Sequence, residues 1–93
     1  MGGQVKSRHQ ITRAAELESL AQFRAFIDDV CALQPGIDQD ACYELKLAVD
    51  EACTNIIVHG YEGMNPGSII LALILEPERM VARITDFGHP FEH

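Results

Sequence analysis

Apolar residues between Ala41 and His59 recur three or four positions apart. They are Cys42, Leu45, Val49, Ala52, Cys53 and Ile56. Positions three or four apart lie on one face of an α-helix, so this stripe predicts an amphipathic helix with that face in the core. Asp38 is a good N-cap residue for such a helix, and Gly60 is a natural residue for it to stop at.

A line of polar residues runs beside this apolar stripe. Glu51 is followed four residues later by Asn55, and Asn55 four residues later by His59. Because residues four apart are neighbours on a helix surface, the Glu51 carboxylate and the Asn55 amide should project side by side. A carboxylate and an amide at such positions could bind a metal ion and activate a hydroxyl group for reaction. An ordinary amphipathic helix with a polar border would show the same pattern.

A second helix is predicted over residues 14–33, ending before Pro35 and Gly36. Glu16 and Glu18 should lie in its first turn, where the helix dipole favours negative charge. Its core stripe comprises Leu20, Phe23, Ile27, Val30 and Cys31.

Three segments carry strand patterns. Residues 4–12 alternate between side-chain types and predict a polar edge strand, whereas residues 68–75 form a nearly continuous apolar strand. A turn at residues 76–78 leads to an antiparallel partner at residues 80–86. In this second strand of the hairpin, Ala82, Ile84 and Asp86 share the face that should meet the helices.

The order strand, helix, helix, strand, strand predicts an α+β fold. We expect a two-layer sandwich with the helices packed on one face of a mixed or antiparallel sheet. With 93 residues, of which 47% are hydrophobic, the chain has enough apolar residues for one modest core. The sequence therefore predicts a single domain over residues 1–93.

The charge balance limits the possible partners. Seven basic residues stand against 14 acidic ones, a net charge of −7. An acidic chain repels a phosphate backbone, which argues against general nucleic-acid binding. A single bound nucleotide is compatible with this charge, because backbone amides and a metal ion can hold it.

Three cysteines, Cys31, Cys42 and Cys53, occur at core positions of the predicted helices, without a CxxC pair. An odd count without metal-ligand spacing predicts reduced, buried thiols in a cytoplasmic protein. We expect no signal peptide, and the longest apolar run, residues 69–75, is too short to span a bilayer.

Two motifs carry a family resemblance. Glu51-x-x-x-Asn55 and the segment Asp86-Phe87-Gly88-His89-Pro90-Phe91 resemble the N-box and first glycine box of the ATP-binding fold shared by gyrase, histidine kinases and mismatch-repair ATPases. Glu-Ala-Cys-Thr-Asn at residues 51–55, followed by His59 and Tyr61, is similar to the bacterial anti-sigma-factor serine/threonine kinases. The resemblance covers roughly residues 4–91.

The resemblance implies a role for each motif residue. Asn55 would coordinate the Mg²⁺ that bridges the phosphates of ATP, and Glu51 would act as general base toward a protein hydroxyl. Asp86 would accept a hydrogen bond from the adenine amine, and Gly88 would let the backbone approach the purine. His59 would lie near the phosphates. Without a nucleotide, Asp86 could cap a turn with Gly88, and His59 could interact with the helix dipole.

The family also implies partners. A sigma factor or an anti-anti-sigma-type protein would be bound, and a serine or threonine of the partner would be phosphorylated.

The family pattern continues into a lid and a second glycine box that the 93 residues do not contain. We therefore expect an open sheet edge, a homodimer and little phosphotransfer by these residues alone. The alternative is a protein-binding or dimerisation module that keeps the fold without nucleotide chemistry.

Overall fold

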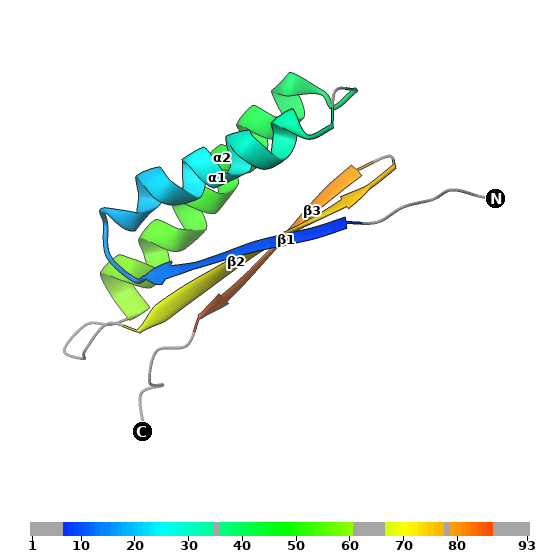
Figure 1. Ribbon diagram of the computed structural model, residues 1–93. Coiled ribbons are helices and arrows are strands. Elements are labelled where there is room, and N and C mark those ends of the chain that lie inside the picture. The colour runs from blue at the N-terminus through cyan, green and yellow to red at the C-terminus, as the bar shows by residue number, and fades with distance from the viewer. Residues whose placement is uncertain (1–6, 35, 61–66, 78, 87–93) are drawn as a thin grey trace.

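The computed structural model describes residues 7–34, 36–60, 67–77 and 79–86, which form two layers (Figure 1). The predicted α+β sandwich is confirmed. Along the chain the elements are β1 (Ser7–Ala14), α1 (Ser19–Ala32), α2 (Gln39–Asn55), a π-helical turn η1 (Ile56–Gly60), β2 (Ser68–Glu76) and β3 (Arg79–Asp86).

The sheet is antiparallel, with the strand order β1-β2-β3. The apolar run at the centre is β2, and β1 is an edge strand as predicted. Leu71 lies opposite Ile11 of β1 and Ile84 of β3, which sets the register. Because side chains alternate between the two faces of a strand, this register turns the apolar rows of β2 and β3 toward the helices, together with Ile11 of the otherwise polar β1.

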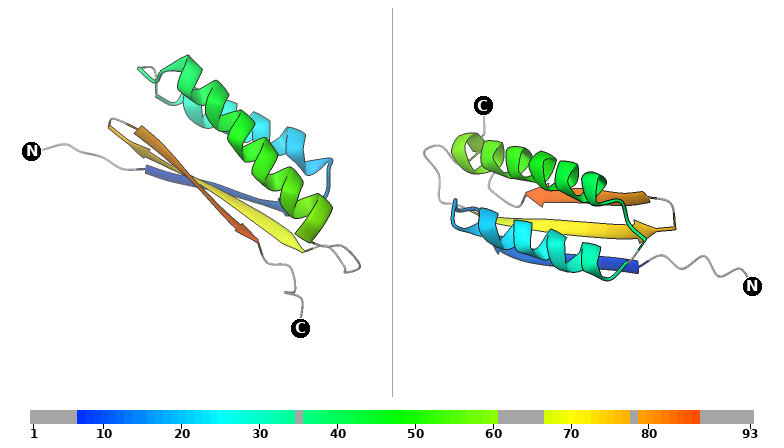
Figure 2. Two further views of the ribbon diagram at one scale, coloured as in Figure 1. Left: turned by 180° about the vertical axis from the view of Figure 1, so that it is seen from behind. Right: turned by 90° about the horizontal axis from the view of Figure 1, so that it is seen from above.

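Both helices lie on the same face of the sheet (Figure 2). Helix α1 contacts β1 and β2, and α2 contacts β3. The core between the layers is built on fully buried side chains of both layers, including Phe23, Ile27, Ile69, Leu71 and Leu73. No helix within the described ranges is long and apolar enough to cross a membrane.

Helix α1 begins later than the sequence predicted. Ala14 still belongs to β1, where it pairs with Ser68, and the amide of Ala15 donates to the carbonyl of Gly67 at 2.9 Å. Pairing with β2 therefore holds the chain extended up to this point. The expectation that Glu16 and Glu18 lie in the first helical turn was wrong, because both precede Ser19.

Helix α2 begins as predicted and ends in an unexpected way. The Asp38 carboxylate accepts a hydrogen bond from the amide of Asp40 at 2.9 Å, which satisfies one of the free amides at the helix start. At the other end the chain stays helical to Gly60, the predicted limit. Residues 56–60, however, form a wider π-helical turn, a feature that is frequent at functional sites.

The expectation of three reduced cysteines was wrong for two of them. Cys31 of α1 and Cys42 of α2 form a disulfide, with their Cα atoms 6.7 Å apart. Cys53 is free and fully buried. Sequence spacing could not indicate the pair, because two consecutive helices have to fold back on each other before these residues meet.

Candidate functional site

The C-terminal half of α2 presents the predicted polar line to solvent. Glu51, Asn55 and His59 are all exposed, His59 being on the π-helical turn, while Val49 and Cys53 are buried on the core side. The helix thus separates its two faces as the spacing predicted. Of the other residues expected in the core stripe, Leu45, Ala52 and Ile56 are half-buried.

Asp86 is the last residue of β3, opposite Ile69 of β2, and is exposed. The end of β3 and the end of α2 lie at the same end of the molecule in every view (Figures 1 and 2). Tertiary structure therefore brings Glu51, Asn55 and Asp86 to one end of the sandwich. Gly88, the remaining predicted site residue, lies outside the described residues.

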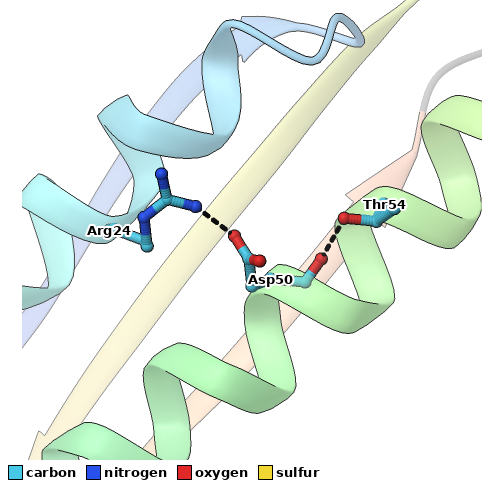
Figure 3. Close-up of polar contacts among 3 residues, drawn as sticks. All are labelled: Arg24, Asp50 and Thr54. Atoms are coloured by element: carbon cyan, nitrogen blue, oxygen red, sulfur yellow. Dashed lines mark hydrogen bonds and ion pairs between the residues drawn. The ribbon is translucent and has the colours of Figure 1, made fainter.

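A polar link beside Glu51 was missed by the sequence analysis (Figure 3). Nη1 of Arg24 in α1 lies 2.5 Å from Oδ1 of Asp50 in α2, and the backbone carbonyl of Asp50 accepts a hydrogen bond from the Thr54 hydroxyl at 2.6 Å. Both ion-pair partners are more than a third exposed, so the pair adds little stability, about 0–1 kcal/mol. It joins α1 to the helical turn that carries Glu51.

The sequence contained one clue to this link. Arg24 is the single basic residue of α1, and it lies 26 positions before Asp50. Only the antiparallel return of α2 beside α1 brings the two side chains together.

The amide oxygen of Asn55 suits a magnesium ion that arrives with a nucleotide. Carboxylate and amide oxygens are hard ligands, and Mg²⁺ is commonly held by one or two protein side chains together with substrate phosphates and water. Within the described ranges, no group of three or more His, Cys, Asp or Glu side chains could hold a metal ion.

A groove of about 480 Å³ lies at the opposite end of the molecule. It is bounded by the turn between α1 and α2 and by the β2–β3 hairpin, and its lining includes Ile37, Leu45 and Met80. This groove is remote from Asn55 and Asp86, so its size says nothing about the predicted nucleotide site.

Cys53, on the core side of the Glu51–Asn55 turn, gives a pH prediction. Burial raises the pKa of its thiol from 9.0 to about 11, and the Asp50 carboxylate adds to the rise. In the unfolded chain the thiol ionises at its ordinary pKa, so the free energy of unfolding should be unaffected below that value. It should fall by roughly 2–3 kcal/mol as the pH rises through the folded-state pKa.

Urea titrations of the wild type and of Cys53→Ala across this alkaline range measure the effect. The variant should be less stable throughout, because a buried group is lost, but it should lack this part of the pH dependence. The same alkaline slope in both proteins would show that Cys53 does not cause it.

The sequence of the chain is similar to those of known proteins. The family described as the histidine kinase-like ATPase domain matches residues 13–93. The serine-protein kinase RsbW of Listeria monocytogenes (strain HCC23) is 31% identical over 61 residues, which is 66% of this chain and 39% of that protein. The anti-sigma F factor of Bacillus licheniformis is 36% identical over 81 residues, 85% of this chain and 52% of that protein.

The anti-sigma F factor of Anoxybacillus flavithermus is 36% identical over 64 residues, which is 69% of this chain and 42% of that protein. The chain thus spans about half or less of the length of these curated relatives.

Proposed function

The chain belongs to the histidine kinase-like ATPase domain family, and on that premise we propose that it binds ATP with Mg²⁺ and works as an anti-sigma-factor-type serine/threonine kinase. The observation that carries the proposal is the placement of Glu51 and Asn55, both exposed and one helical turn apart, at the end of the molecule where β3 ends in Asp86. The similarity to a serine-protein kinase and to anti-sigma F factors supports it.

In this proposal Asp86 and Asn55 divide the recognition of the nucleotide. The Asp86 carboxylate accepts a hydrogen bond from the 6-amino group of adenine; guanine has an acceptor at that position, so GTP is disfavoured. Gly88 lets the backbone approach the purine. Asn55 supplies an amide oxygen to Mg²⁺, which neutralises phosphate charge when it is bound, and His59 lies on the phosphate side.

Glu51 is the proposed general base. Its carboxylate accepts the proton of a serine or threonine hydroxyl of the partner protein while the hydroxyl oxygen forms a bond to the γ-phosphorus of ATP. The bond from that phosphorus to the bridging oxygen breaks, and ADP leaves. Exposure of Glu51 fits this role, because a large protein substrate has to reach the carboxylate.

The partner classes follow from the same proposal. The protein would bind a sigma factor, an anti-anti-sigma-type protein or both, and would act as a homodimer. β1 and β3 form the edges of the described sheet, and an exposed edge can pair with another chain. The alternative function is a protein-binding or dimerisation module that retains the fold without nucleotide chemistry.

Calorimetric titration with ATP, ADP and GTP, with and without Mg²⁺, tests nucleotide binding. We expect a preference for adenine nucleotides that falls about tenfold in Asp86→Asn, because a hydrogen bond to a charged group is lost. Asn55→Ala should remove the Mg²⁺ dependence but keep the adenine preference. Glu51→Gln should bind ATP normally, and in a longer chain that includes the family's lid and second glycine box it should fail to transfer phosphate to the partner protein.

Each variant has a matched control that makes the same or a closely similar chemical change away from the site. Asp29→Asn on α1, Gln39→Ala and Glu44→Gln at the start of α2 all alter exposed residues and should leave binding unchanged. Equal affinity for ATP and GTP would contradict the role of Asp86. No binding of any nucleotide at millimolar concentration would favour the binding-module alternative.

A further inference from the structure

The face of the sheet that the helices leave uncovered carries an apolar centre. Ile70 and Ile74 of β2 and Val81 of β3 alternate with the core residues of their strands and do not belong to the core beneath the helices. All three are half-buried. In Figure 2 both helices lie on the opposite face, and no other element of the described chain covers this one.

Arginines surround one end of this apolar centre. A shallow groove of about 420 Å³, here called the outer sheet groove, runs across all three strands. Ile74 at its centre lies opposite Arg8 of β1 and Val81 of β3. The lining residues are Ser7, Arg8, Ile74, Glu76, Arg79, Val81 and Arg83.

The charge of the outer sheet groove is opposite to that of the chain as a whole. Three arginines face one glutamate there, whereas the chain carries a net charge of −7. Arg79 is paired with Glu76 at 2.5 Å. Arg8 and Arg83 are exposed, and neither forms an ion pair with a carboxylate of the described residues. Two cations beside an apolar surface are therefore available to a partner.

We propose that the outer sheet groove binds an acidic amphipathic helix of a partner protein. The inner face shows the kind of element that fits such a sheet: α1 and α2 cover it with apolar stripes, and acidic residues outnumber basic ones on both helices. On the outer face, a helix with an apolar stripe would cover Ile74 and Val81. Its flanking carboxylates would meet Arg8 and Arg83.

Other occupants fit less well. A nucleic acid would match the arginines but not the apolar centre, and the net charge of the chain repels it. A second copy that stacked the same end of its sheet on this groove would bring arginines against arginines. The groove is also distinct from Glu51, Asn55 and Asp86, so the proposal goes beyond the nucleotide chemistry and does not depend on it.

The test uses the whole chain and a synthetic helical peptide of leucine and glutamate, with leucine at helical i, i+3, i+4 and i+7 positions. Backbone amide NMR shifts on titration should change along β1, β2 and β3 around Arg8, Ile74 and Arg83. Affinity should fall as salt is added, because the contribution of surface charges is screened. A peptide with lysine in place of glutamate, and a DNA duplex, should not bind.

Charge reversal makes the test specific. The double variant Arg8→Glu, Arg83→Glu should bind the acidic peptide about tenfold more weakly, since two attractions become repulsions. Lys46→Glu makes the same kind of change on the helix layer and should leave the affinity unchanged. Arg83→Gln serves as a milder variant if the double variant is poorly folded by circular dichroism, and it should still weaken binding.

Several results would overturn the proposal. Shifts confined to α2 and the end of β3 would place the peptide elsewhere. Equal binding of the lysine peptide would show that charge plays no part, and binding of DNA instead of the peptide would make the groove a nucleic-acid surface. Shifts at Ile74 and Val81 that depend on protein concentration without peptide would assign the face to a second copy.

Discussion

Replacing Ile27 with alanine should lower the free energy of unfolding by about 2–5 kcal/mol. The Ile27 side chain is 0% exposed and packs from α1 into the core between the layers. Truncation leaves a cavity in addition to the lost apolar burial, and the surrounding side chains refill it only in part. Urea titration followed by circular dichroism measures the change.

The matched control is Leu47→Ala. Leu47 is an apolar residue of α2 whose exposed fraction is 54%, so its truncation should change the free energy of unfolding by less than about 0.5 kcal/mol. Ile56→Ala should lower the free energy of unfolding by an amount between those of Ile27→Ala and Leu47→Ala, because Ile56 is half-buried. Asn55→Ala should resemble Leu47→Ala, since its proposed role is to bind Mg²⁺. A loss at Asn55 as large as that at Ile27 would make Asn55 a structural residue.

Reduction of the disulfide between Cys31 and Cys42 should lower the free energy of unfolding by about 3 kcal/mol. The cross-link joins residues 11 positions apart and restricts the unfolded chain, while the native contacts of α1 and α2 remain after reduction. Thermal unfolding with and without dithiothreitol measures the effect. A count of free thiols under denaturing conditions accompanies it.

A double variant, Cys31→Ala with Cys42→Ala, provides the control. Its stability should be low and should not respond to dithiothreitol, whereas Cys53→Ala should keep the response of the wild type. Three free thiols in the untreated protein, or equal stability before and after reduction, would contradict a stabilising cross-link in solution.

The sequence predicted the elements whose patterns are local. The stripe that includes Val49 and Cys53 predicted α2 and its buried face, and the same four-residue spacing predicted that Glu51 and Asn55 project side by side. The apolar run from Ile69 to Leu75 predicted the central strand. These inferences succeeded because helical and strand periodicities determine which side chains share a face before any tertiary contact forms.

Helix α1 shows where local pattern was insufficient. Residues 14–18 are compatible with a helix, but β1 extends to Ala14 because β2 offers a partner as far as Ser68. Backbone pairing with a distant strand therefore outweighed helix propensity, which is a weak influence for each residue. The helical segment ends at Gly60 as predicted, but residues 56–60 form a π-helical turn and not a regular α-helical one.

Periodicity determined the secondary structure, the core stripes and the exposed Glu51–Asn55 pair, because each depends on neighbours within a few residues. Only the tertiary structure decided the contacts between distant segments: the disulfide, the pair of Arg24 with Asp50, the placement of Asp86 at the α2 end, and the grouping of Arg8 with Arg83. Each of these requires helices to fold back or strands to pair in one register. That register is set by burying the apolar rows of β2 and β3 together with Ile11 of β1.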